Sequence, residues 1–476
     1  MMADLTVDLA VVGAGPGGYA AAFLAADRGQ SVVLIEQDAR LGGVCLNRGC
    51  IPSKALLHAT ELMRETKGSG ELRGIRFGAP SVELARLRAW KESILERLGQ
   101  GIQRLAERRG VQRLQGRAAF EDSHTLLVAS AQGSQRVRAT RTILAVGSKP
   151  ALPALFDVGS DRVLTSTEAL ELPEVPKRLL IVGGGYIGME LGTVYATLGS
   201  HVVLVEALQT ILAGVDTDLM RPILRSAQAL FGELRTGTRV TALRVAGNTV
   251  RATCEGTAGV REESYDRVLV CVGRVPHCDG LRLEQTKVRR SAQGFLEVDA
   301  ARRTEDPAIW AIGDCIGPPL LAHKASHDAR LAVESIVGGS STARPAVIPS
   351  VVFTDPELAW CGLTEAEARA QGVPVEIVRF PWSASGRAMS LDRTDGLTKL
   401  LIEPTTERVL GVGIVGVSAG ELIGEGVLAI EAGATAKTLA RAVHPHPTLS
   451  ETLQEAAALF YGTSAHVLGR RSGARS

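Results

Sequence analysis

The chain contains 476 residues, and at about 150 residues per domain this length suggests two to four domains. Hydrophobic residues make up 45% and charged residues 22% of it, as in globular proteins, so a disordered or fibrous chain is excluded. The 53 basic and 51 acidic residues nearly cancel, which gives no sign of a nucleic-acid partner. We therefore expect a multidomain globular protein that does not bind nucleic acid.

The chain start and the cysteines indicate the compartment. The first 27 residues contain no Lys, Arg or His, whereas a secretory signal begins with a basic segment. No stretch reaches the roughly 18 uncharged apolar residues that a membrane helix requires. Seven cysteines are too few for a disulfide-stabilised scaffold of this length. These features predict a soluble, cytoplasmic protein with no membrane partner.

Strand-like and helix-like patterns alternate along most of the chain, and this alternation ends only beyond residue 346. There, extended runs precede a helix, which indicates an α+β module of roughly 130 residues. In chain order we expect a strand–helix–strand unit at 7–36, helices at 52–67 and 82–109, a strand at 142–147, a second strand–helix–strand unit at 177–206, strands at 267–273 and 308–313, a helix at 326–337, a linker at 338–346, strands at 397–403 and 409–415, a helix at 421–432, and a frayed basic tail at 469–476.

The two strand–helix–strand units share one motif. Each has a G-x-G-x-x-G turn after its first strand and a Glu at the close of its second. This context predicts a dinucleotide site. The first glycine allows the tight turn, the second lets the pyrophosphate approach the backbone, and the third lets helix and strand pack closely, while the acid binds a ribose diol. The residues are Gly13, Gly15, Gly18 and Glu36 in the first unit and Gly183, Gly185, Gly188 and Glu206 in the second.

Glu206 also favours one nicotinamide cofactor over the other. Its carboxylate would repel a 2′-phosphate, and the residues that follow it are Ala, Leu, Gln and Thr rather than Arg. NAD is therefore expected in preference to NADP. Two dinucleotides on one chain suggest hydride transfer between them, usually between a flavin and a nicotinamide.

Cys45 and Cys50 are separated by only four residues. Pro52 stands where a first helical position is expected, which places Cys50 just outside a helix N-terminus. Such a position lowers a thiol pKa from about 8.5 towards roughly 3.5–7.5, and Lys54 adds positive charge. The pair predicts a redox-active disulfide. A zinc site is disfavoured because no second Cys/His pair has suitable spacing, and two unrelated buried cysteines are the remaining alternative.

A histidine-containing segment near the C-terminus offers a base for thiol chemistry. His446 is followed five residues later by Glu451, which could orient its imidazole. His444 is an equally good candidate from spacing alone. Thr448 and Glu451 also fit a capping box that opens the last helix. The spacing leaves these alternatives open.

At this point the motifs resemble those of the flavin-dependent pyridine nucleotide–disulfide oxidoreductases. The likeness extends from residue 7 to residue 458, and its most specific elements are GGVCLNRGCIPSK at 42–54, HPTLSE at 446–451 and AIGD at 311–314. The resemblance implies an α/β fold with two Rossmann-like domains, the first holding FAD and the second NAD. It further implies a C-terminal α+β module that forms a homodimer.

The resemblance also assigns residues. It implies that Cys45 and Cys50 form the disulfide, and it selects His446 over His444 as the base, with Glu451 as its catalytic partner in the neighbouring subunit's site. Asp314 would contact the ribityl chain of FAD, and the backbone at Ala322 would face the isoalloxazine ring. The remaining implied cofactor positions are Lys54 paired with Glu190, Ala118 near the FAD adenine, Gly147, and Val240 and Gly273 near NAD.

These motifs are similar to those of the family members that oxidise dihydrolipoamide with NAD. The implied partners are a small-molecule dithiol, a lipoyl-bearing acyltransferase or a glycine cleavage carrier protein, within a 2-oxoacid dehydrogenase or glycine cleavage complex. The alternatives are a reductase of another small disulfide, a flavin enzyme that bypasses sulfur, and a subunit that mainly serves assembly. The mercuric type carries a C-terminal Cys pair, whereas the last cysteine here is Cys361. Arg48 departs from the family pattern, which commonly has an apolar residue there.

The expected domain boundaries follow from this likeness. Residues 1–150 would form the first part of the FAD-binding domain and 151–273 the NAD-binding domain. Residues 274–345 would complete the FAD-binding domain, and 346–476 would form the C-terminal dimerisation domain.

Overall fold

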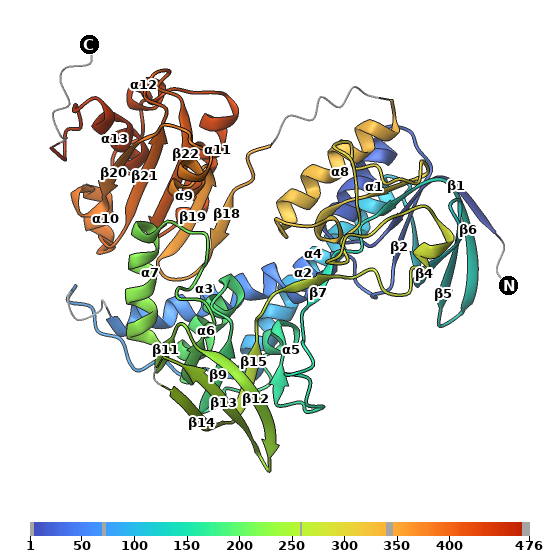
Figure 1. The fold of residues 1–476 in the computed structure, drawn as a ribbon, viewed down its shortest axis with the longest axis horizontal. Helices are drawn as coiled ribbons and strands as arrows, with labels where there is room; N and C mark the ends of the chain where they lie inside the picture. Colours follow the sequence, from blue (N-terminus) through green and yellow to red (C-terminus); the bar gives the residue numbers. More distant parts are fainter. Residues whose placement is uncertain (1–3, 69–72, 258, 339–345, 469–476) are drawn as a thin grey trace.

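Three large sheets organise the protein, as seen in a computed structural model that describes residues 4–68, 73–257, 259–338 and 346–468 (Figure 1). Two sheets are built on parallel strands with covering helices, and the third is antiparallel. The expected α/β fold with two dinucleotide-binding units and a C-terminal α+β module is confirmed. The predicted linker from residue 338 and the basic tail from 469 lie almost wholly or wholly outside the described residues.

The first sheet has the strand order β3-β2-β1-β6-β5-β4, with β17 paired to β6. β1 and β2 are parallel, and β2 is buried along its whole length, which explains its continuous apolar sequence. β17 joins this sheet from more than 160 residues beyond β6. The strands are β1 (Leu5–Val12), β2 (Val32–Glu36), β3 (Gln112–Gln115), β4 (Arg117–Asp122), β5 (Thr125–Ser130), β6 (Gly133–Leu144) and β17 (Ile309–Ala311).

Helices from both ends of the first 336 residues cover this sheet. α1 and α8 pack against each other, so the late segment that contains β17 and α8 completes the early domain (Figure 1). Because of this return of the chain, residues beyond 310 can reach the first dinucleotide site. The helices here are α1 (Pro16–Asp27), α2 (Gly43–Arg48), α3 (Cys50–Gly68), α4 (Leu84–Arg108) and α8 (Ala322–Ile336), with 3-10 turns at Leu283–Gln285 and Gly313–Ile316.

The second sheet is parallel, in the order β11-β10-β9-β15-β8. Its β9–α6–β10 unit repeats the β1–α1–β2 unit of the first sheet. An antiparallel three-stranded sheet and a two-stranded ribbon flank it. The elements are β8 (Val163–Leu164), β9 (Arg178–Val182), β10 (His201–Val205), β11 (Glu233–Arg235), β15 (Arg267–Val270), α5 (Ser166–Glu171), α6 (Tyr186–Leu198), α7 (Thr217–Leu230), β12 (Arg239–Ala246), β13 (Thr249–Gly256), β14 (Gly259–Tyr265), β7 (Ser148–Pro150) and β16 (Arg274–Pro276).

The third sheet is antiparallel, in the order β18-β19-β22-β21-β20. Helices α11 and α13 pack on it and close a separate hydrophobic core. The elements are β18 (Ser350–Val352), β19 (Glu357–Gly362), β20 (Glu376–Pro381), β21 (Leu397–Ile402), β22 (Val409–Gly416), α9 (Glu365–Ala370), α10 (Gly386–Leu391), α11 (Ala419–Glu431), α12 (Ala436–Arg441), α13 (Glu451–Phe460) and a 3-10 turn at Trp382–Ala384.

Two helix starts differ from the sequence prediction. The helix expected from residue 52 begins at Cys50, and the one expected from residue 326 begins at Ala322. In the first case the backbone N–H of Ser53 donates to Gly49 O, so the first turn closes two residues earlier than Pro52 suggested. Among the described residues, every helix is too short or too polar to traverse a lipid bilayer. The four-part division at residues 150, 273 and 345 stays a prediction.

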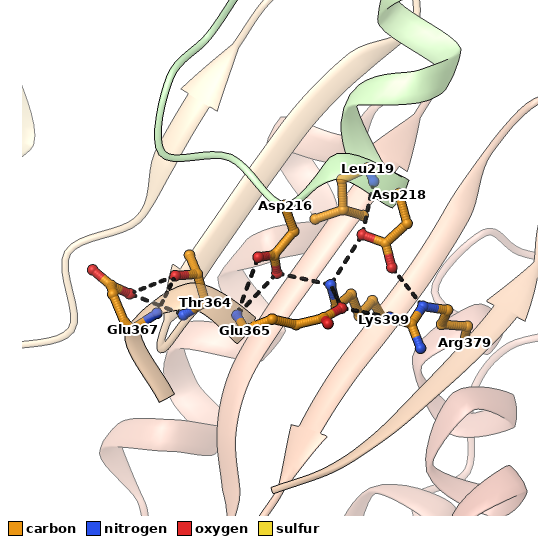
Figure 2. A network of polar contacts seen from close by, with 8 residues as sticks. All are labelled: Asp216, Asp218, Leu219, Thr364, Glu365, Glu367, Arg379 and Lys399. Atoms are coloured by element: carbon orange, nitrogen blue, oxygen red, sulfur yellow. Dashed lines mark hydrogen bonds and ion pairs between the residues drawn. The ribbon is translucent and has the colours of Figure 1, made fainter. Parts of the chain in front are cut away.

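A buried lysine joins the second and third sheets (Figure 2). The Lys399 side chain, on β21, is fully buried, and its Nζ lies 2.7 Å from Asp216 Oδ2, 3.0 Å from Asp218 Oδ1 and in contact with Glu365. Burial favours the neutral form of Asp218, but hydrogen bonds from Arg379 and Lys399 outweigh it and lower the pKa of this carboxyl. The three carboxylates have a spacing that could suit a metal ion, yet the Lys399 ammonium already lies among them.

We expect Lys399→Met to lower the free energy of unfolding by about 3–5 kcal/mol, because three carboxylates would lose their buried cation. Urea unfolding followed by circular dichroism measures this loss. Lys437→Met, at an exposed lysine of α12, is the control and should change stability by less than about 0.5 kcal/mol. Since the depressed pKa of Asp218 stabilises the fold only above the ordinary value of 3.8, the difference should shrink as pH falls below that value. Equal stabilities of the two variants would contradict this role.

Candidate active site

The two glycine turns are built alike. A Cβ on Gly13 would lie 2.4 Å from Ala145 O, and one on Gly18 would lie 1.8 Å from Gly13 O. In the second turn, a Cβ on Gly183 would lie 2.4 Å from Cys271 O, and one on Gly188 would lie 2.1 Å from Gly183 O. Gly13 and Gly183 also have positive φ angles, +99° and +108°. No other residue fits these positions, and each turn leads directly into a helix N-terminus.

The two acids hold the same place beside these turns. Glu36 accepts hydrogen bonds from Ala14 N at 2.8 Å and Asp38 N at 3.0 Å. Glu206 accepts from Gly184 N and Leu208 N, both at 2.7 Å. Each carboxylate is thereby fixed at the end of its strand with acceptor capacity left for a ribose diol. Burial raises the pKa of Glu36, but backbone hydrogen bonds oppose this shift.

An elongated cavity of about 1550 Å³, part of it open to solvent, runs from the first glycine turn to the two thiols. It is bounded by the end of β2 and by the N-termini of α1 and α8, so unpaired N–H groups face it from two helices. These features fit a dinucleotide such as FAD. The predicted positions that line the cavity are Gly13, Gly15, Glu36, Cys45, Cys50, Lys54, Ala118, Gly147, Glu190, Asp314 and Ala322.

Several cavity residues were missed by the sequence analysis. Arg274 donates from Nε to Ser148 Oγ and from Nη2 to Ser148 O, both at 2.7 Å. Ser148 Oγ donates to Asp314 at 2.5 Å, so the three residues form a chain of hydrogen bonds along the wall. Tyr186 also lines the cavity. The sequence did offer one signal for two of these residues, which is that each directly follows a glycine of the predicted cofactor sites. Arg274 follows Gly273, and Tyr186 follows Gly185.

The two thiols lie on consecutive helices, Cys45 within α2 and Cys50 at the first position of α3. The prediction that Cys50 lies just outside a helix was wrong, because α3 begins at this residue. A hydrogen bond from the Cys45 thiol, together with the nearby Lys54 ammonium, lowers the pKa of Cys50 to about 7, although burial opposes the shift. The same hydrogen bond, together with burial, raises the pKa of Cys45.

Lys54 is held by a buried acid that three parts of the chain share. Its Nζ lies 2.8 Å from Glu190 Oε2, which also accepts from Ser53 Oγ at 2.9 Å. The other carboxylate oxygen accepts from Phe353 N at 3.0 Å, and the Phe353 ring centroid is 4.4 Å from Nζ. Glu190 lies on α6 and Phe353 in the third-sheet region, so this ion pair fixes the lysine beside Cys50 from outside its own helix.

The second glycine turn adjoins the same cavity through α6. Tyr186, its first residue, lines the cavity although the turn glycines and Glu206 do not. Gly273 has a φ of +123° and open space around it. Val240, which was expected near NAD, has its side chain buried in a hydrophobic cluster, so only its backbone could face a ligand.

The C-terminal histidines have different surroundings. His446 Nδ1 is 2.8 Å from Glu451 Oε1, and its side chain is 75% exposed. His444 is buried and its Nε2 lies 2.8 Å from Glu425, so it is a structural residue. Only half of the capping box expected from Thr448 forms, because Ser450 is the N-cap of α13 and has no side-chain cap. That half is the hydrogen bond that Glu451 accepts from Thr448 N at 2.7 Å while it holds His446.

His446 and Glu451 do not line the cavity that holds the thiols. Figure 1 shows α13, which begins at Glu451, in the C-terminal module and well away from α2. Within one chain, therefore, this exposed His/Glu pair and the two thiols form separate sites.

Comparisons with known proteins agree with this architecture. Residues 7–329 match the family described as pyridine nucleotide-disulphide oxidoreductase, and residues 348–457 match its dimerisation domain. The chain is 42% identical to the dihydrolipoyl dehydrogenases of Vibrio parahaemolyticus and Haemophilus influenzae, in each case over 97% of both chains. It is 41% identical to that of Geobacillus stearothermophilus over 96% of this chain and 97% of the relative.

Among solved structures, the chain is similar to LpdA from Mycobacterium tuberculosis, with a TM-score of 0.88 and 27% identity over 95% of this chain and 99% of that one. It is also similar to the HOCl-induced flavoprotein disulfide reductase RclA from Escherichia coli, in its Cu(II) complex. That similarity has a TM-score of 0.86 and 26% identity over 95% of this chain and 99% of that one.

The thiol geometry predicts how alkylation depends on pH. In the reduced protein, iodoacetamide should modify Cys50 with a midpoint near pH 7, because its pKa is about 7. Cys45→Ala removes the strongest hydrogen bond to the thiolate and should move the midpoint to higher pH, and Lys54→Met should do so less. Peptide mass spectrometry identifies the modified cysteine. An unchanged midpoint in Cys45→Ala would contradict the thiol-to-thiolate hydrogen bond.

Proposed function

The chain belongs to the pyridine nucleotide–disulphide oxidoreductase family, and we propose that it catalyses dihydrolipoamide + NAD⁺ → lipoamide + NADH + H⁺. The observation that carries this proposal is the pair of thiols with opposite pKa shifts, placed in a cavity that two dinucleotide-binding units share. The 42% identity to dihydrolipoyl dehydrogenases over 97% of both chains supports the choice of substrate.

When bound, FAD would supply a two-electron acceptor for the cysteine pair, and NAD⁺ would supply the final hydride acceptor. Gly13, Gly15, Gly18 and Glu36 would hold the adenosine diphosphate part of FAD, and Asp314 its ribityl chain. Gly183, Gly185, Gly188 and Glu206 would hold NAD. The residues of the chain then have three tasks, which are to exchange disulfides, to stabilise a thiolate and to move a proton.

In disulfide exchange, the Cys45–Cys50 disulfide is the oxidant. A dihydrolipoamide thiolate attacks Cys45, the S–S bond breaks, and Cys50 leaves as a thiolate. The second substrate sulfur then attacks the mixed disulfide, which releases lipoamide and leaves both cysteines reduced. Cys50 is the better leaving group because Lys54 and the N-terminus of α3 stabilise its thiolate. The Cys45 thiol adds to this stabilisation only after lipoamide has left and both cysteines are reduced.

His446 is the base that accepts the dithiol proton. Glu451 fixes the imidazole through Nδ1, which leaves Nε2 to face the substrate. Because the pair is exposed on the dimerisation domain and lies away from its own thiols, we assign it to the active site of a second copy. The enzyme would then be a homodimer with two composite sites.

The wider partners belong to the same proposal. A dihydrolipoamide oxidase would receive its dithiol as a free molecule or on the lipoyl arm of an acyltransferase or a glycine cleavage carrier protein. The complex could thus be a 2-oxoacid dehydrogenase or a glycine cleavage system. The cytoplasmic location expected from the sequence stays a prediction.

A second candidate function is the reduction of another small disulfide, which the similarity to a flavoprotein disulfide reductase favours. Steady-state turnover distinguishes the two. The turnover of dihydrolipoamide is measured with NAD⁺ and with NADP⁺. The turnover of glutathione disulfide with NADPH is measured as the competing reaction. Faster turnover of glutathione disulfide would overturn the assignment to dihydrolipoamide.

We expect kcat/KM for NAD⁺ to exceed that for NADP⁺ by at least about tenfold, or about 1.4 kcal/mol. Glu206 is held beside the second glycine turn by two backbone N–H groups, where it would accept from a free 2′-hydroxyl and repel a 2′-phosphate. Glu206→Arg should lower this preference for NAD⁺. Glu206→Gln should remove the repulsion of the 2′-phosphate without adding an attraction to it. Similar values for the two cofactors in the unmodified enzyme would refute the role of Glu206.

A test of the composite site uses two inactive variants. His446→Gln should lose dithiol turnover by about 10²–10⁴-fold, while NADH oxidation by an artificial acceptor that bypasses sulfur should largely survive. Co-expression of His446→Gln with Cys50→Ser gives heterodimers with one intact site, so purified heterodimers should recover about half of the wild-type activity. Flavin content and gel filtration verify that each species is folded and dimeric. Inactive heterodimers would place His446 in its own subunit's site.

A further inference from the structure

Arg48 lies inside the segment that carries both cysteines, and the sequence motifs leave it without a role. It is the last residue of α2, between Cys45 and Cys50, and it lines the elongated cavity. A guanidinium is costly to enclose without partners, because it carries a permanent charge and five N–H donors. Its surroundings therefore indicate which anionic group it serves.

Among the described residues, Asp38 is the hydrogen-bond acceptor of Arg48. Arg48 Nη2 lies 2.5 Å from Asp38 Oδ2, and both side chains are about one-third exposed, at 34% and 27%. Asp38 N in turn donates to Glu36 Oε1 at 3.0 Å. Arg48 thus reaches from the helix that carries Cys45 to the loop beside the ribose-binding acid, and only one edge of its guanidinium is used.

The position of Arg48 along the cavity matches one part of FAD. In this cofactor the pyrophosphate connects the adenosine ribose to the ribityl chain. Glu36, expected at the ribose, and Asp314, expected at the ribityl chain, both line the cavity. The helix that ends at Arg48 begins at Gly43, which packs against Gly15 in the first glycine turn, where a Cβ on Gly43 would lie 2.5 Å from Gly15 Cα. Arg48 is thus a cation near the turn where a pyrophosphate would bind.

Two other titratable groups on this part of the cavity wall, Asp279 and His277, do not neutralise the charge of Arg48. Asp279 pairs with Lys149, so its charge is already balanced. Burial lowers the pKa of His277, and Lys149 and Arg48 are among the cations that lower it further, so His277 is neutral near pH 7. The permanent charge of Arg48 is then opposed mainly by Asp38.

We propose that Arg48 binds the pyrophosphate of FAD through the guanidinium edge that Asp38 leaves free. This inference rests on the proposed use of FAD and is independent of the dithiol substrate. Arg48 strengthens a phosphate site that the glycine turn and the N-terminus of α1 begin, since Arg pairs with phosphate oxygens through two parallel N–H groups. Asp38 orients the side chain but also repels the ligand.

The test measures FAD binding by the apoprotein through flavin fluorescence. Arg48→Val should raise the Kd by about tenfold, and Arg48→Lys should raise it less, because the charge remains without the planar fork. The affinity of Arg48→Val should also depend less steeply on salt. Arg40→Val is the matched control and should leave the Kd unchanged, because Arg40 lies on the neighbouring loop, pairs with Glu92 and Glu96, and does not line the cavity.

Asp38→Asn separates pyrophosphate binding from mere bracing of the loop. If Arg48 contacts the ligand, removing the carboxylate frees the guanidinium and should leave FAD binding equal or tighter. If Arg48 only ties α2 to the loop after β2, Asp38→Asn should weaken binding as much as Arg48→Val does, and the proposal is overturned. Circular dichroism of each apoprotein establishes that the variants are folded.

Competition with nucleotide fragments locates the contact. ADP, which carries the pyrophosphate, should compete less well in Arg48→Val than in the unmodified protein, whereas adenosine should compete equally in both. Equal ADP competition would overturn the proposal. Failure of the unmodified apoprotein to bind FAD would instead refute the proposed function, and absent dihydrolipoamide turnover with normal FAD binding would leave the role of Arg48 standing.

Discussion

The chemistry depends on the positive surroundings of Cys50, which lies at the N-terminus of α3 and beside Lys54. In the reduced pair the proton remains on Cys45, and the negative charge is placed on Cys50. During exchange Cys45 is bonded to sulfur and has no proton to donate, so Lys54 and the helix N-terminus decide which sulfur leaves as the thiolate. The glycine turn at residue 49 makes this possible because it brings consecutive helices into contact.

The lysine that supports the thiolate is itself held from outside. Glu190 accepts hydrogen bonds from Lys54, Ser53 and Phe353 and is almost completely buried. A carboxylate buried at this depth needs hydrogen-bond partners for its oxygens, and the three donors supply them. Since the donors come from α3 and from the third-sheet region, the charge beside Cys50 depends on correct packing of all three parts of the chain.

Sequence reasoning found the local features and missed those that depend on long-range packing. The glycine turns, Glu36, Glu206 and the cysteine pair follow from spacing, because each acts within one strand–turn–helix unit. The place of Arg274 and Ser148 on the cavity wall could not be predicted, because it results from the pairing of the distant strands β16 and β7. α3 begins two residues before the start that Pro52 predicts, because Ser53 N donates to Gly49 O and so closes the first turn earlier.

The proposed role of His446 as a base in the active site of a second copy requires a rigid C-terminal module. Effective proton transfer requires heavy atoms within about 3 Å, and an error of about 1 Å can cost two orders of magnitude in rate. The C-terminal module must therefore keep its place relative to α3. Arg64 of α3 binds Asp355 at 3.1 Å, and Arg393 binds the same carboxylate from the C-terminal module.

The buried Lys399 cluster fixes this module against the N-terminus of α7. A surface contact would give little energy for such a purpose, whereas ion pairs with a fully buried cation strongly disfavour any separation of the domains. The two sets of ion pairs hold the C-terminal module in place, which is the rigidity that the proposed role of His446 in a second copy's active site would require.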